Sequence, residues 1–204
     1  MAGARVERGM TEEACGLLDG VGLRPAGRVR WGESIPCDQA GVYLVETPTL
    51  YSIAPIDIKV VSGWLERLPK LELDGRRPTP REVAARLAAF WLPSHSVIYV
   101  GATSAPIAER IGDFYATPLG DRSPHAGGHW IKTLRLLREC WVSWAIAEDP
   151  FGSEDELLTR FAATASPSEV AALFDPEHVL PFANLEDAQK VRKRHGMRYQ
   201  RAPR

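Results

Sequence analysis

The 204-residue sequence predicts an α/β domain with a small central sheet of three strands, flanked by helices and carrying a helical insertion and extensions at both ends. Three runs predict strands, because each is short, rich in β-branched and aromatic residues and bounded by turn residues: 41–46, 96–101 and 140–146. Apolar residues at helical spacing lie between these runs, and this alternation is typical of α/β architecture. The composition, 45% hydrophobic and 25% charged, is that of a globular chain with a continuous core.

Composition also argues against several classes of protein. The longest apolar run, residues 140–147, is far shorter than the ~20 residues that cross a bilayer, and the first ten residues have no apolar signal core. We therefore expect a cytoplasmic protein without membrane contact. Cys15, Cys37 and Cys140 are too far apart in the sequence for a zinc knuckle and odd in number, so we expect reduced, buried thiols.

Before the first strand, residues 1–40 form a lead-in. A short helix is expected from about residue 11 to 18, capped by Thr11 and ended by Gly20 and Gly22, and a loop follows to residue 41. Residues 47–95 then form an insertion with one helix over 58–68 and a second helix after Thr79. This second helix has a capping box, since Pro80 occupies its first position and Glu82 its third.

After the second strand, the spacing of apolar residues predicts helices over 105–115 and 129–138, separated by a loop rich in Gly and Pro. In the third strand, Cys140, Val142, Trp144 and Ile146 alternate with Trp141, Ser143 and Ala145, which is the two-residue period of a β-strand. Ser153 and Glu156 read as a capping box that opens the next helix, and Ser166 with Glu169 reads as another. The main domain is therefore expected to span residues 41–189.

Positive charge is concentrated at the C-terminal end. Residues 190–204 contain seven Lys and Arg and no acid, which leaves residues 1–189 with 18 bases, 26 acids and a net charge of −8. Such a basic tail is able to neutralise nucleic-acid phosphates, although a solvated, frayed terminus of the same composition is equally common.

Individually, the motifs of the chain are ordinary, since most strand tyrosines are amphipathic core residues. Their order is more informative, and it resembles the pattern of the GIY-YIG nuclease family. The matching residues are Gly41-Val42-Tyr43, Tyr99-Val100-Gly101-Ala102-Thr103, Arg110, Glu154 and Pro181-x-x-Asn184. The resemblance is direct over 96–110, fair at 154–161 and 181–184, and absent from the first 35 residues and from 47–95.

The resemblance implies a three-stranded sheet that hydrolyses nucleic-acid phosphodiesters with one divalent metal, Mg²⁺ or Mn²⁺. It implies that Glu154 is the metal ligand, because one carboxylate with substrate oxygens and waters can hold a hard ion. The alternative is that Glu154 follows a Ser153 cap and only favours the helix dipole.

Four further residues receive catalytic roles from the same resemblance. Arg110 would bind the phosphoryl group, and its alternative is a surface pair with Glu109 or Asp113. Tyr43 would activate or orient the water, and a phenol acting as a base near neutrality needs its pKa lowered from ~10 by about two to three units. Tyr99 would contact the phosphate or position Tyr43. Asn184 would tie its loop to the site, or act as a turn residue or cap.

The chain departs from the family pattern at three points. Ala102 occupies the position where many relatives carry Lys or Arg, so a cation near the tyrosines or the phosphate is missing. The Tyr or His that often follows the arginine by one turn is replaced by Phe114, and Tyr115 and His125 are the proposed substitutes, His125 as a proton donor to the leaving oxygen. Tyr43 and Tyr99 are 56 positions apart, which requires an inserted subdomain.

The sequence therefore predicts a metal-dependent endonuclease acting on DNA, with the insertion and the basic tail contacting substrate. Two alternatives stay open: a catalytically silent domain of this fold that binds nucleic acid or protein, and a protein-interaction scaffold in which the tyrosines are core. The sequence leaves open the DNA structure recognised and the choice among restriction, repair and mobile-element roles.

Overall fold

A four-stranded antiparallel sheet forms the centre of the chain in the computed structural model, which describes residues 10–121, 123–125, 127–187 and 189–199. Its strand order is β1-β5-β2-β4, with bounds β1 Gly27–Arg30, β5 Trp141–Ile146, β2 Gly41–Glu46 and β4 Val97–Thr103. The mixed α/β class is confirmed. In the register of β2, Tyr43 lies opposite Gly101 of β4 on one side and Trp144 of β5 on the other.

The prediction of a three-stranded sheet is corrected, because the lead-in supplies β1 as a fourth strand at the edge. Its Gly-Arg-Val-Arg sequence contains one apolar residue, so local pattern does not mark it as a strand. The strand is held by β5: the guanidinium groups of Arg28 and Arg30 lie 4.2 Å and 3.8 Å from the Trp141 ring centroid. Contacts across the sheet therefore decide this element.

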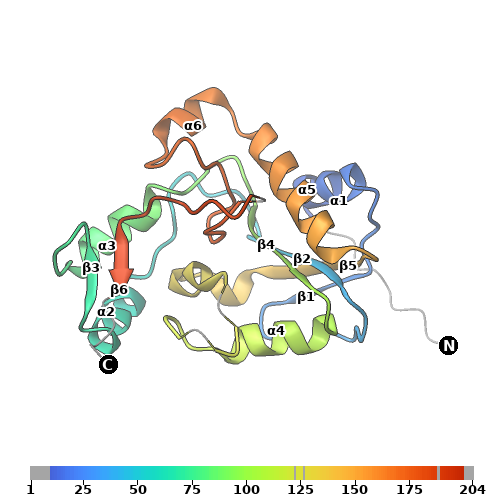
Figure 1. Cartoon of the computed structure of the whole chain (residues 1–204), viewed down its shortest axis with the longest axis horizontal. Coiled ribbons are helices and arrows are strands. Elements are labelled where there is room, and N and C mark those ends of the chain that lie inside the picture. The colour runs from blue at the N-terminus through green and yellow to red at the C-terminus, as the bar shows by residue number, and fades with distance from the viewer. Residues whose placement is uncertain (1–9, 122, 126, 188, 200–204) are drawn as a thin grey trace.

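Helices cover both faces of the sheet (Figure 1), with α4 on one face and α1 and α5 on the other. The helices are α1 Glu12–Gly20, α2 Ile58–Arg67, α3 Pro80–Ala88, α4 Ile107–Ala116, α5 Pro150–Thr164 and α6 Pro167–Ala172. The Thr11 cap and the capping boxes of α3 and α6 are confirmed. These local signals place the helix starts where the sequence predicts them.

Two helix predictions are corrected. Helix α5 begins a turn earlier than expected, because Asp149 caps it by accepting a hydrogen bond from the Gly152 N–H and Pro150 occupies its first position. Glu154 is therefore the fifth helical residue rather than the first, so the helix-dipole explanation loses weight. Residues 129–138, expected to form one helix, form two short 3₁₀ turns, η1 His129–Thr133 and η2 Leu137–Glu139.

The basic C-terminal segment packs against the insertion up to residue 199. Strand β6, Met197–Tyr199, pairs antiparallel with β3, Leu71–Leu73, which lies in the insertion between α2 and α3. Lys193 is buried and donates hydrogen bonds from Nζ to the carbonyls of Pro181 and Phe182. Residues 189–199 therefore belong to the folded structure, unlike a frayed terminus.

The core divides into two apolar clusters, one on each face of the sheet. Tyr43 and Tyr99 belong to the larger cluster, which includes α4 and the helices of the insertion, whereas Val42, Val100 and Ala102 belong to the cluster under α1 and α5. The described part of the chain has no helix long and apolar enough to span a membrane.

Candidate active site

The two motif tyrosines lie side by side on the neighbouring strands β2 and β4. Tyr43 is fully buried, Tyr99 is nearly so, and their ring centroids are 6.0 Å apart. Gly101 makes room for the Tyr43 ring, because a Cβ at this position would lie 2.6 Å from Tyr43 Cζ. The second motif therefore needs its glycine to admit the tyrosine of the first.

Three possible donors surround the hydroxyl oxygen of Tyr43. His125 Nε2 lies 3.2 Å away, and the Gly127 N–H donates to His125 Nδ1 at 3.2 Å, so a neutral ring carries its proton on Nε2 and donates it to Tyr43. Side-chain contacts with Tyr99 and Arg110 also lower the pKa of Tyr43, as donors to its oxygen do. Negative charge on this oxygen would therefore be well supported by hydrogen bonds.

Burial nevertheless controls the protonation of both phenols. It raises the pKa of Tyr43 to about 12, with Arg110 acting in the opposite direction, and it raises the pKa of Tyr99 well above its ordinary value. Both residues are therefore protonated at neutral pH. The shift is opposite in direction to the one that a tyrosine base needs.

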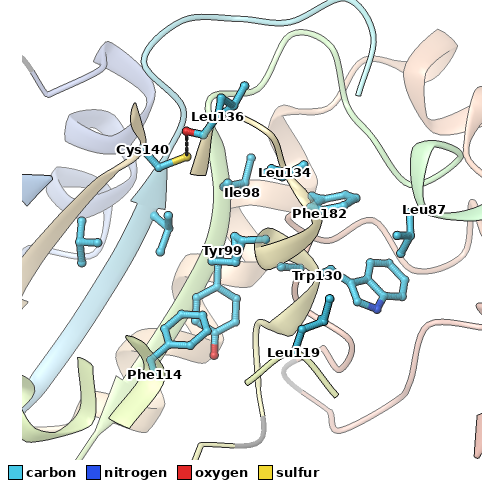
Figure 2. Packing of buried hydrophobic residues seen from close by; sticks show 14 of the residues in the cluster. Leu87, Ile98, Tyr99, Phe114, Leu119, Trp130, Leu134, Leu136, Cys140 and Phe182 are labelled. Atoms are coloured by element: carbon cyan, nitrogen blue, oxygen red, sulfur yellow. Dashed lines mark hydrogen bonds between the residues drawn. The ribbon is translucent and has the colours of Figure 1, made fainter. Parts of the chain in front are cut away.

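His125 lies in the loop between α4 and η1. Its ring is buried and stacks on Phe114 with centroids 4.2 Å apart and planes at 10°, so Phe114 holds the orientation of the His125 ring. Figure 2 shows the Phe114 ring against Tyr99 as well. The backbone N–H of His125 donates to Thr117 Oγ1 at 3.1 Å, and His129 Nε2 donates to the His125 carbonyl at 2.8 Å.

Burial and the charge of Arg110 lower the pKa of His125 to about 3. The ring is therefore neutral at physiological pH and donates only through Nε2. The role predicted for His125, proton donor to a leaving oxygen, does not fit this state, because a neutral imidazole is a poor acid.

Arg110 and Glu154 are the more accessible members of the group, and both are half-buried. Arg110 lies in α4 and Glu154 in α5, the helices on opposite faces of the sheet. Their charges act on the same group: Arg110 lowers and Glu154 raises the pKa of Tyr43. The structure thus brings Tyr43, Tyr99, Arg110 and Glu154 within electrostatic reach of one another.

Burial raises the pKa of Glu154, while the charges of Lys190 and Arg110 act to lower it. No group of three or more His, Cys, Asp or Glu side chains able to hold a metal occurs within the described ranges. One carboxylate at an accessible position is compatible with a hard ion that takes its other oxygens from substrate and water. The residues present therefore fit a site that substrate completes.

Asn184 and Tyr115 lie outside the group around Tyr43. The Asn184 side chain accepts from the Val100 N–H at 2.9 Å and donates to the Val100 carbonyl at 2.8 Å, which ties its loop to β4. Tyr115 packs on Trp31 with ring centroids 4.8 Å apart, and burial raises its pKa to about 12. No interaction in the described part of the chain joins Tyr115 to Tyr43 or Tyr99.

Two glycines that sequence reasoning did not single out shape the site. A Cβ on Gly127 would lie 2.8 Å from Tyr99 Oη, and Gly128 has a φ of +66° and no room for a Cβ beside Phe114. The run His-Ala-Gly-Gly-His was the available signal, because adjacent glycines between two histidines indicate close approach of backbone to side chains.

No family model matches the chain, and neither a curated protein nor a solved structure matches it.

Proposed function

We propose that this protein is a metal-dependent endonuclease that hydrolyses phosphodiester bonds of DNA with Mg²⁺ or Mn²⁺. The observation that supports the proposal is that two opposite charges act on the paired phenols of Tyr43 and Tyr99. These charges are the Arg110 guanidinium and the Glu154 carboxylate, which come from helices on opposite faces of the sheet. Phosphodiester hydrolysis needs charge stabilisation at the phosphoryl group and a positioned water.

In this proposal each residue of the group has a role that is compatible with its placement. Arg110 binds the phosphoryl oxygens, because its planar, permanently charged fork matches them. Glu154 holds the divalent ion, which when bound stabilises developing charge and lowers the pKa of water. Tyr43, protonated at neutral pH, orients water through its hydroxyl rather than removing the proton. Tyr99 and His125 position Tyr43, and Asn184 positions β4.

Two observations favour a second candidate, a catalytically silent nucleic-acid-binding domain. Tyr43 is 0% exposed, so water does not reach it in this conformation. Ala102, at the position where a basic residue is common in the family, packs into the apolar cluster under α5.

Cleavage assays separate the candidates. The purified protein is incubated with Mg²⁺, with Mn²⁺ or with EDTA, and with duplex, branched and single-stranded DNA. We expect metal-dependent cleavage whose rate falls about 100-fold or more in Glu154→Gln and Arg110→Gln, the magnitude found when a charge-stabilising group is removed.

Glu156→Gln is the matched control, because Glu156 is an exposed residue of the same helix whose carboxylate pairs with Arg160 at 3.0 Å. It should cut like the unmodified protein. If the protein binds DNA but cleaves it under none of these conditions, the nuclease proposal fails and the catalytically silent binding domain is supported. If the protein neither binds nor cleaves DNA, the remaining hypothesis is the protein-interaction scaffold in which the tyrosines are core residues.

A further inference from the structure

One lysine of the C-terminal segment faces the acidic residues in the second turn of α5. Lys190 Nζ lies 3.7 Å from Asp155 Oδ1, and Lys190 is the foremost of the charges that lower the pKa of Glu154. Asp155 Oδ1 is itself buried without a hydrogen-bond partner in the described part of the chain. The Lys190 ammonium is thus positioned beside the proposed metal ligand.

The backbone around Lys190 has an uncommon conformation for a side-chain-bearing residue. Its φ is +63°, in the left-handed region. Asp187 stabilises this turn: its Oδ1 accepts from the N–H groups of Gln189 and Val191 at 2.9 Å and 2.8 Å, and its carbonyl accepts from the Lys190 N–H at 3.0 Å. A residue held in this region by its surroundings motivates a hypothesis of function.

Neighbouring cations of the segment have other partners. Arg192 pairs with Glu186 at 2.7 Å, Arg194 pairs with Glu177 at 2.5 Å, and Lys193 is buried against backbone carbonyls. The side chains of Lys190, Arg192 and Arg194 are all exposed, at 65%, 78% and 67%, and what distinguishes Lys190 is the 3.7 Å length of its pair with Asp155. A pair that is both exposed and this long contributes little and is readily exchanged for another anion.

From this geometry we infer that Lys190 binds a backbone phosphate of a nucleic-acid strand that enters beside Glu154. The ion pair between Lys190 and Asp155 breaks when this contact forms. The inference rests on the proposed function, since it adds a phosphate contact to the same site. Lys190 then supplies the cation that the sequence lacks at position 102, from a segment far along the chain.

The salt dependence of DNA binding tests this contact without requiring cleavage. Binding of a fluorescent 30-base-pair duplex of mixed sequence is measured by anisotropy in EDTA between 50 and 200 mM NaCl. Loss of one phosphate contact reduces the slope of log K against log salt by about 0.9. For Lys190→Gln we therefore expect this reduction, equivalent to about 3.5-fold less change in affinity over that range.

Two variants make the result specific. Lys190→Arg should restore the slope, because it keeps the charge. Arg192→Gln, two residues away and already paired with Glu186, should leave the slope unchanged. A Lys190→Gln slope equal to that of the unmodified protein would overturn the inference even if the protein cleaves DNA. If Lys190→Gln binds DNA with the reduced slope and the unmodified protein does not cleave it, the inference about Lys190 holds and the nuclease proposal fails. If the unmodified protein does not bind DNA, both the inference and the nuclease proposal are overturned.

Discussion

At the scale of single residues, burial outweighs hydrogen bonding in setting protonation. The Tyr43 oxygen has His125 Nε2 at 3.2 Å and contacts with Tyr99 and Arg110, yet its pKa rises to about 12. The same desolvation lowers the pKa of His125, because burial disfavours the charged form of either group. The interior of the site is therefore neutral at physiological pH, and the charged groups around it are the half-buried side chains of Arg110 and Glu154.

The pKa of His125 predicts a pH dependence of stability. Between about pH 3 and its ordinary pKa of 6.5, the unfolded chain binds a proton at His125 that the folded chain does not. The free energy of unfolding should therefore rise with pH through this window and fall as pH is lowered, by up to about 1.4 kcal/mol per pH unit. Urea unfolding at pH 4 to 7 should show a shallower dependence in His125→Gln.

The control for that comparison is Tyr115→Phe, which removes a buried hydroxyl without a hydrogen-bond partner in the described structure and leaves acid titration alone. It should keep the slope of the unmodified protein. Equal slopes in His125→Gln and the unmodified protein would show that the folded chain accepts this proton as easily as the unfolded one.

At the scale of elements, the edge strand β4 needs a partner on its open side. Among the described strands, ordered β1-β5-β2-β4, only β2 pairs with it, and Asn184 bonds both the N–H and the carbonyl of Val100. The amide thus acts as a short piece of a neighbouring strand. This arrangement explains why the asparagine matters to the second motif without contacting the tyrosines.

Substitution of Asn184 should destabilise the protein. Asn184→Ala removes two hydrogen bonds of about 1 kcal/mol each and leaves both Val100 groups without their partner, so we expect a loss of about 2 kcal/mol or more in urea unfolding. Asn184→Asp should cost more, because it places a buried carboxylate oxygen against the Val100 carbonyl. Gln189→Ala, at an exposed position, should change stability little. An Asp variant as stable as the unmodified protein would contradict this role.

At the scale of the whole molecule, the C-terminal segment connects parts that are distant in the sequence. Strand β6 pairs with β3 of the insertion, the Arg194 N–H donates to the buried Asp175 carboxylate at 2.7 Å, and Lys193 Nζ approaches the rings of Phe90 and Trp130. The segment therefore completes the larger apolar cluster as well as carrying Lys190.

Truncation tests this dependence. A chain ending at residue 189 loses β6, Lys193 and Arg194, and we expect it to melt at least several degrees lower, since each 1 kcal/mol shifts Tm by ~2–4 °C at this size. Circular dichroism during heating measures the change, with Val191→Ala, an exposed position in the same segment, as the control. An unchanged melting temperature would show that the segment adds nothing to stability.

The candidate site residues were predicted from the resemblance of their order along the chain to a known family. Local sequence determined the three apolar strands and the capped helices α1, α3 and α6. These depend on alternation, capping and turn chemistry within a few residues, which a single sequence displays. Tertiary structure alone decided the edge strand β1, the protonation of Tyr43 and His125, and the placement of Lys190 beside Glu154. The reason is physical: burial and electrostatic pairing depend on which residues distant in the chain come together, and neither is encoded in any local pattern.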